Sequence, residues 1–486
     1  MIGLFINKQK NQAMRNIKYI FRNLFRRPVY SMVSIVGMSL AIASILIIFV
    51  NVSYLMNYDK VHQKGDRIYR LNGKLITAEG INYHSRLGPA LGLTMLREFP
   101  EIENAFRLRS FGKQLVSVPG KEVSMMERTH IADKSIFDVF TLSLIQGSKE
   151  DALSEPNQVV ICESLAKKLF GTTQVLGKSI KIDNHQLHAI SGVMKDMPGN
   201  THHHIKILSS IPPAFSNLEF LIKKDGEESH WMPAVYTFIL LNKNADIQSV
   251  HDKFPEFYEN HMAGFGKQIN TKFELITTPL YKLHFARHFD FDQAGGNYTY
   301  VYVFSIVAFF LLMIAAINYA NMFSSDLISR SKNFGIRKLN GASPFHLAGI
   351  ILKEFAVIIG ISLLIGMIAE SIIIKQFAHH FAFEGSLPYF KLIIISLFII
   401  LVFFILVSLL SYPIINQSKQ NPVFLLQKNQ KPVFGFLPTG INKPLITIQL
   451  TLSIILIMSS ILISKQLNFL LKSDMGYDKN NVVMVK

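Results

Sequence analysis

Five histidines lie between positions 185 and 204, and imidazole nitrogen is a common ligand for zinc. Three of them are consecutive, at 202–204, so their side chains point in different directions, whereas ligands spaced i and i+4 on a helix converge. Cys162 is the only cysteine, so no cysteine pair can complete a metal site and no intramolecular disulfide can form. This spacing favours a solvated loop over a metal centre, and we expect no bound metal.

The stretch 171–179 (GTTQVLGKS) resembles a phosphate-binding loop, in which backbone N–H groups surround a phosphate and a lysine contacts it. It has one residue too many between its two glycines, and it precedes an expected strand rather than a helix. The spacing of the other polar residues predicts neither a Ser/His/Asp arrangement nor a carboxylate pair. We therefore expect no catalytic residue and no cofactor in this chain.

The most informative polar segment is short and basic, residues 330–343 (RSKNFGIRKLNGAS), and it lies between two apolar runs of membrane length. A segment of this size cannot form a catalytic domain. It can form a small protruding helix that another protein binds. Ile336 and Leu339 can form an apolar ridge that fits a groove in the partner, with Arg337 and Lys338 beside it.

Two further features of this segment favour a docking element. Gly335 and Gly341 interrupt it, and Ser343 followed by Pro344 suits the N-cap and first turn of the next helix. Neither feature is needed under the alternative interpretation, in which the two basic residues only fix the orientation of the chain in the membrane.

The apolar residues are concentrated in runs that are long enough to cross a bilayer as helices, which takes roughly 20 residues. A helix satisfies its backbone polar groups internally, as lipid demands. A further run, 355–374, contains Glu370, which we place near one helix end, where its side chain reaches the membrane surface. The uncharged runs are 28–58, 293–325, 392–418 and 444–464.

The chain has a formal charge of +17, which in a soluble protein often indicates nucleic-acid binding. Here the charge lies beside the spans. Residues 1–27 contain seven Lys or Arg and no acid, and 326–345 and 416–443 are also basic, whereas 376–389 contains no Lys or Arg. The positive-inside rule therefore places the N-terminus in the cytoplasm. We expect a multi-pass protein of the inner (plasma) membrane that binds lipid and no nucleic acid.

Residues 13–27 repeat apolar side chains every three or four positions among basic ones, which predicts an amphipathic helix on the anionic inner leaflet. The basic region is long and the apolar run after it has full span length. This end is therefore expected to be an uncleaved signal anchor.

The region 57–297 is large enough for one or two subdomains with their own cores. Strands and helices are interspersed in it, so we predict an α+β domain. The predicted fold is an α-helical membrane protein with about five transmembrane helices and a large α+β extracytoplasmic domain. The expected strands are 67–76, 158–161 and the hairpin 179–193, and the expected helices are 90–108, 163–170 and 246–262.

The first and last crossings follow the same plan. An Arg-Pro pair at 27–28 and Tyr-Asp-Lys at 58–60 recur as Lys-Pro at 443–444 and Tyr-Asp-Lys at 477–479. This suggests an internal duplication. The second copy begins an external domain and then stops, so we expect the chain to be the N-terminal part of a longer one or a truncated gene product.

The expected organisation alternates between the two sides of the membrane. It comprises a cytoplasmic amphipathic segment (1–29), a span (30–56), the external domain (57–297), a span (298–325), a cytoplasmic coupling loop (326–345), a span (346–375), an external loop (376–389), a span (390–415), a cytoplasmic loop (416–443), a span (444–464) and the start of a second external domain (465–486).

This order of elements resembles the MacB/FtsX-type ABC transporter permeases, in a Bacteroidetes-like duplicated form. Residues 333–342 (NFGIRKLNGA) are similar to the cytoplasmic signature of that family, although Asn333 stands where the family has an acid, so a salt bridge from that position is absent. Residues 412–426 resemble a second family pattern. Residues 169–178 and 192–202 resemble the MacB-like periplasmic core domain.

The resemblance implies a permease subunit that has no ATPase of its own and is coupled to a separate ABC ATPase subunit. ATP hydrolysis in that partner would change the shape of the external domain, a mechanotransmission that exports lipoprotein, peptide or drug. The resemblance also implies a homodimer or pseudo-dimer, and a periplasmic adaptor or outer-membrane partner. The coupling residues that it implies are Gly335, Ile336, Arg337, Lys338, Leu339, Gly341, Ala342 and Ser343.

The alternative function is regulatory. FtsX-like proteins share this topology and control an external partner such as a cell-wall hydrolase. A membrane enzyme or sensor kinase is not expected, because the longest cytoplasmic loop, 416–443, is too short for a catalytic domain.

Overall fold

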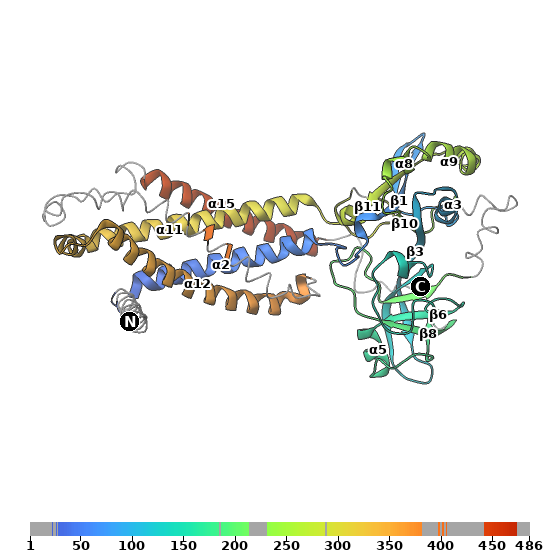
Figure 1. Ribbon diagram of the computed structural model, residues 1–486, viewed down its shortest axis with the longest axis horizontal. Coiled ribbons are helices and arrows are strands. Elements are labelled where there is room, and N and C mark those ends of the chain that lie inside the picture. The colour runs from blue at the N-terminus through green and yellow to red at the C-terminus, as the bar shows by residue number, and fades with distance from the viewer. Residues whose placement is uncertain are drawn as a thin grey trace, which may run out of the picture. The chain divides into compact units, whose positions relative to one another are not determined.

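The computed structural model has two units, a set of long helices and a domain built on a β-sheet (Figure 1). The helical unit comprises Met1–Asn51, Val303–His380 and Ser386–Lys486, and the sheet domain is chiefly Val52–Tyr302. The residues that the structure describes are 28–183, 186–212, 231–286, 289–381 and 442–473, with single helical positions at 22, 26, 397, 398, 401, 402 and 405.

Four described helices are long and apolar enough to cross a membrane. They are α2 (Pro28–Met56), α11 (Tyr298–Leu339), α12 (Pro344–Phe381) and α15 (Asn442–Lys472). The chain is thus a helical membrane protein with a large mixed α and β domain, as predicted. The predicted amphipathic helix 13–27, the span 390–415 and the loops 376–389 and 416–443 lie largely or wholly outside the described residues.

The last helix is longer than predicted. We expected a span that ends at 464, but α15 continues to Lys472. No glycine or proline lies between these two positions, and Lys, Gln and Leu are good helix formers, so nothing in the sequence ends the helix there. Most of the expected start of a second external domain, residues 474–486, lies outside the described residues.

Small and aromatic side chains fix the packing of the long helices. A Cβ atom on Gly366 of α12 would lie 3.0 Å from the side chain of Ile42 in α2, so glycine is what allows this close approach. Ser362 of α12 donates a hydrogen bond to the carbonyl oxygen of Ile35 at 3.3 Å. The rings of Tyr319 in α11 and Phe355 in α12 lie 4.7 Å apart.

The sheet domain contains one mixed sheet whose described strands follow the order β11-β1-β10-β3-β4-β9-β6-β8-β5, with β2 paired to β1 and β7 paired to β3 and β8. The strands are β1 (Ile68–Thr77), β2 (Gly80–His84), β3 (Ile102–Ser117), β4 (Ser124–Ala132), β5 (Leu144–Gln146), β6 (Gln158–Cys162), β7 (Ser179–Ile182), β8 (Gln186–Met194), β9 (Ile207–Ser210), β10 (Tyr236–Leu241) and β11 (Lys272–Pro279).

Short helices connect these strands. They are η1 (Gly65–Arg67), α3 (Leu91–Glu98), α4 (Ile136–Val139), α5 (Glu163–Phe170), α8 (Ile247–His251), α9 (Phe254–His261), α10 (Ala263–Gln268) and η4 (Leu280–Phe285). Two hydrophobic cores result. One centres on the stacked rings of Phe106 and Phe238, which lie 5.0 Å apart, and the other contains Trp231, the only tryptophan of the chain.

Several local predictions for this domain are confirmed. The strand expected at 67–76 is β1, the helix expected at 163–170 is α5, and the hairpin expected at 179–193 is the antiparallel pair of β7 and β8. Gly171 has φ +76° and ends α5, so the stretch that resembles a phosphate-binding loop is the end of a helix followed by the strand β7.

Two helix predictions are wrong in extent. The helix expected at 90–108 ends at Glu98, because Pro100 disfavours helical backbone at Phe99, and the apolar residues after it form β3. The helix expected at 246–262 is split into α8 and α9. Asp246 caps the first of these by accepting a hydrogen bond from the backbone N–H of Gln248.

Candidate docking site

The sequence-predicted docking residues lie at the end of α11 and in the turn that follows it. The small separate helix that we expected is not present. Gly335 to Leu339 are the last residues of α11, which runs without a break for 42 residues from Tyr298. The sequence contains no proline in this helix, so nothing interrupts the backbone hydrogen bonds between the apolar part and the basic part.

Glycine ends this helix. Gly341 has φ +86°, a left-handed conformation that L side chains rarely adopt. The backbone N–H of Ala342 donates to the carbonyl oxygen of Arg337 at 3.0 Å, which is the long bond of a Schellman motif. Asn340 donates to the carbonyl oxygen of Ile336 through both its backbone N–H and its side-chain amide.

Serine and proline begin the next helix. The Oγ atom of Ser343 accepts a hydrogen bond from the backbone N–H of His346 at 3.2 Å, as an N-cap residue does. Pro344 is the first residue of α12, where its missing N–H costs nothing. The predicted cap is confirmed, and α11 and α12 form a helical hairpin with a tight turn.

Substitution by alanine should have opposite effects on amide exchange at Gly341, which has a positive φ, and at Gly349, which lies inside α12. Gly341→Ala should destabilise the turn by about 1 kcal/mol because of the positive φ, and so speed amide exchange in residues 336–346 about fivefold. Gly349→Ala, inside α12 and with no atom within 4 Å of the added Cβ, should slow exchange or leave it unchanged. Hydrogen-exchange mass spectrometry on the full chain measures both, and equal effects would contradict the assigned turn.

The end of this hairpin presents an apolar ridge. Ile336 is 44% exposed and Leu339 is 59% exposed, and their spacing of three residues places them on one side of the helix. Gly335 is buried, Arg337 is half-buried, and the side chain of Lys338 is outside the described residues. This arrangement can bind an apolar groove in a partner.

Two family domains match the chain. Residues 31–257 match the MacB-like periplasmic core domain, and residues 305–419 match the FtsX-like permease C-terminal domain, which contains the hairpin turn. The chain belongs to the MacB/FtsX-type ABC transporter permeases. The resemblance that the motifs indicated is therefore confirmed.

Three solved structures align with just under half of this permease. A domain of a permease protein from Porphyromonas gingivalis is 21% identical with a TM-score of 0.39, and the alignment covers 45% of this chain and 91% of that one. The periplasmic region of MacB from Actinobacillus actinomycetemcomitans is 13% identical with a TM-score of 0.31 and the same coverage. The extracellular domain of the noncanonic ABC-type transporter YknZ from Gram-positive bacteria is 14% identical with a TM-score of 0.27, covering 43% of this chain and 99% of that one. A comparison with curated proteins found no match.

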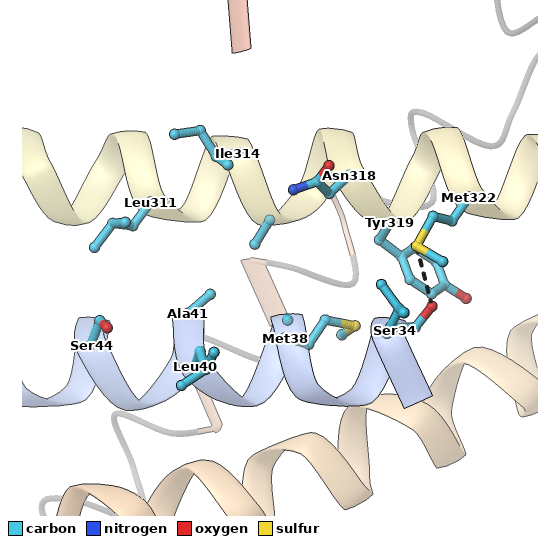
Figure 2. Close-up of a pocket in the computed structure, with 13 residues that line it drawn as sticks. Ser34, Met38, Leu40, Ala41, Ser44, Leu311, Ile314, Asn318, Tyr319 and Met322 are labelled. Carbon is cyan, nitrogen blue, oxygen red and sulfur yellow. Dashed lines mark hydrogen bonds between the residues drawn. The ribbon is translucent and has the colours of Figure 1, made fainter. Parts of the chain in front are cut away.

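Polar contacts that the sequence motifs did not predict join the membrane helices of the permease. A groove of about 340 Å³ lies between α2 and α11, and Figure 2 shows Ser34 directed towards Met322 across one end of it. On α11, the side chain of Asn318 accepts a hydrogen bond from the side-chain amide of Gln449 of α15 at 2.7 Å. Asn318 and Gln449 are polar residues inside uncharged apolar runs, and this was the feature of the sequence that could have revealed a contact between the helices.

The prediction for Glu370 is wrong. We expected its side chain to reach the membrane surface, but it is only 5% exposed, and α12 continues past it to Phe381. The hydroxyl of Ser371 donates to its carboxylate at 3.4 Å. The spacing of charges along α12 could not reveal this burial, which depends on neighbouring helices.

The solvated loop predicted at 202–204 is also wrong. His202 is 7% exposed and His203 is 3% exposed. His202 lies in a buried polar network, and the ring of His203 packs against the rings of Tyr236 and Phe238. Within the described part of the chain, no group of three or more His, Cys, Asp or Glu side chains is arranged to hold a metal ion.

Proposed function

We propose that this permease transmits conformational change from a separate ABC ATPase subunit to the sheet domain. The observation that carries the proposal is the exposed apolar ridge of Ile336 and Leu339, which lies at one end of a single helix whose other end continues into the sheet domain. A groove in the ATPase would bind this ridge, as grooves bind the apolar face of a helix in other complexes.

The length of α11 supports the proposed role as a lever. Its uncharged part ends at Ser325, and residues 326–339 add about 20 Å of helix at 1.5 Å per residue. An unbroken helix resists bending, so a displacement at Leu339 moves the opposite end near Tyr298. The charge distribution of the loops supports an N-terminus and hairpin in the cytoplasm and a sheet domain outside the inner membrane.

In this proposal the moving sheet domain drives export of a lipoprotein, peptide or drug that is already outside the membrane. The alternative, FtsX-like control of an external partner such as a cell-wall hydrolase, uses the same lever. The two differ only in what binds the sheet domain, so the docking experiment below tests the step that they share.

The docking proposal predicts a large loss of binding from single charges on the ridge. Ile336→Asp and Leu339→Asp should each reduce co-purification of the ABC ATPase at least about tenfold, because a carboxylate in an apolar groove pays a desolvation penalty. The measurement is the ATPase retained per membrane-extracted permease.

The matched control is Ile81→Asp, which places the same charge at an isoleucine of β2 that is 52% exposed. It should leave the amount of bound ATPase unchanged. If the two ridge variants retain as much ATPase as this control, the ridge is not the docking site.

A further inference from the structure

Two segments connect the sheet domain to its membrane helices. The incoming segment, residues 57–62, follows α2, and the outgoing segment, residues 289–297, precedes α11. The last residues of α2 and the first of α11 belong to the same unit as the sheet, so their contacts with it can be described directly.

A loop at 198–204 is hydrogen-bonded to the incoming segment at three places. The side-chain amide of Asn200 donates to the carbonyl oxygen of Asn57 at 2.9 Å, and the backbone N–H of Asp59 donates to the carbonyl oxygen of Asn200 at 2.9 Å. The backbone N–H of His202 then donates to Oδ1 of Asp59 at 2.9 Å. Asp59 is 3% exposed, so these bonds are shielded from water.

The same histidine reaches the outgoing segment. Its Nε2 lies 3.0 Å from Oδ1 of Asp292, and because a carboxylate only accepts, Nε2 carries the proton. Arg70 of β1 donates to both oxygens of Asp292, at 2.8 and 2.6 Å, and its side chain is fully buried. The outgoing segment is thus joined to β1 of the sheet and, through His202, to the incoming segment.

Stacked rings reinforce this connection. His284 of η4 stacks on Tyr58 of the incoming segment, with ring centres 3.4 Å apart and planes inclined by 8°. Its neighbour Phe285 stacks on Tyr298, the first residue of α11, at 4.2 Å. The backbone N–H of Gly296 donates to the carbonyl oxygen of His284 at 2.7 Å. One short helix therefore contacts both connecting segments.

We infer that Asp59, His202, Asp292 and Arg70 form a clasp that holds the end of α2 and the start of α11 to one point of the sheet. The two helix ends cannot separate without breaking buried, charge-assisted hydrogen bonds. The strength of the clasp therefore determines how far the helices must move before the domain changes shape. This role in transmission rests on the proposed function. The holding action itself does not.

The clasp has two arms, Asp59 on the incoming segment and Asp292 on the outgoing segment, and they differ in how well their carboxylates are hydrogen-bonded. Asp292 has hydrogen bonds to both oxygens, whereas Oδ2 of Asp59 has no hydrogen-bond partner among the described residues although it is buried. An unpaired buried carboxylate oxygen is costly. Burial accordingly raises the pKa of Asp59 to about 6. The incoming arm is therefore the weaker one and should open first.

Hydrogen exchange of the full chain in detergent tests the clasp without any ATPase. His202→Phe keeps a ring but removes the bond to Asp292, and should speed exchange in both 57–62 and 289–297 about tenfold or more, the effect of losing one charge-assisted bond. The matched control is His188→Phe, since His188 is a buried histidine of β8, which lies near the opposite end of the strand order from β1.

A second pair of variants keeps the test decisive if His202→Phe unfolds the domain. Asp59→Asn retains the Oδ1 acceptor and should exchange like the unmodified chain, whereas Asp59→Ala should speed exchange of 57–62. Unchanged exchange in both segments for His202→Phe, or equal exchange for the two Asp59 variants, overturns the clasp. Either result would leave the docking measurement on Ile336 unaffected, so the two proposals fail separately.

Discussion

Lowering the pH from about 7 to about 4 should unfold the sheet domain of the intact permease, because several histidines are buried there in the neutral form, among them three whose pKa falls to about 4. His62 and His130 are 1% exposed and His284 is 6% exposed. Burial disfavours the imidazolium ion and lowers the pKa of each ring from 6.5 to about 4.

The loss of folding stability at low pH follows from proton uptake by the unfolded chain. Below about pH 6.5 the unfolded chain binds protons on these rings, while the folded domain does not until about pH 4, so their contribution is complete above pH 6.5 and is lost as the pH falls. Each shift corresponds to about 3 kcal/mol, and three together approach the whole stability of a domain. Asp59 opposes this, since its raised pKa means that protonation on acidification stabilises the fold, but it is one group against three.

The only tryptophan of the 486-residue chain makes this unfolding measurable. Trp231 is 4% exposed in the second core, so its fluorescence reports on the sheet domain and not on the membrane helices. His284→Phe should move the acid midpoint to lower pH, because neither ring nitrogen of His284 has a partner to lose among the described residues. His346→Phe, at an exposed histidine of α12, should not move it. Equal midpoints for the two variants would refute the assignment to buried histidines.

Asp133→Ala should destabilise the sheet domain by about 3–5 kcal/mol, the cost of leaving a buried charge without its partner. Arg107 is 1% exposed, and its guanidinium donates to both oxygens of Asp133, at 2.8 and 2.7 Å. The backbone N–H of Arg107 also donates to Asp133 at 2.8 Å. Removing the carboxylate therefore leaves three donors without an acceptor at once.

Denaturant unfolding followed by Trp231 fluorescence measures this loss. The double variant Arg107→Met with Asp133→Ala should recover part of it, because the charge is gone while the backbone N–H stays unpaired. Glu274→Ala is the control, since its bond to Lys74 on the same sheet is partly exposed and should contribute under about 1 kcal/mol. A loss for Asp133→Ala no larger than that of the control would show that the pair does not stabilise the domain.

Features that depend on neighbouring residues in the chain could be predicted from the sequence. The turn at Gly341, the cap at Ser343 and the helix α5 with its glycine end all follow from local backbone preferences. The extent of α3 could also have been read locally, from Pro100, and our longer helix ignored that signal.

The environment of single polar residues could not be predicted in this way. His202 was expected in solvent and is instead buried between two segments that are about 90 and 140 positions away in sequence. Glu370 was expected at the membrane surface and is buried. In both cases burial is decided by which elements pack against the residue, and no local pattern records that choice.

The sequence by itself determined that this is a membrane permease with a short basic segment between two spans, because length, apolarity and charge act through solvent and lipid on each segment separately. Only the tertiary structure decided that α11 is one unbroken helix and that Asp59, His202 and Asp292 meet beside Arg70. The physical reason is that a hydrogen bond between distant segments depends on the distance that folding creates, and spacing along the chain carries no information about that distance.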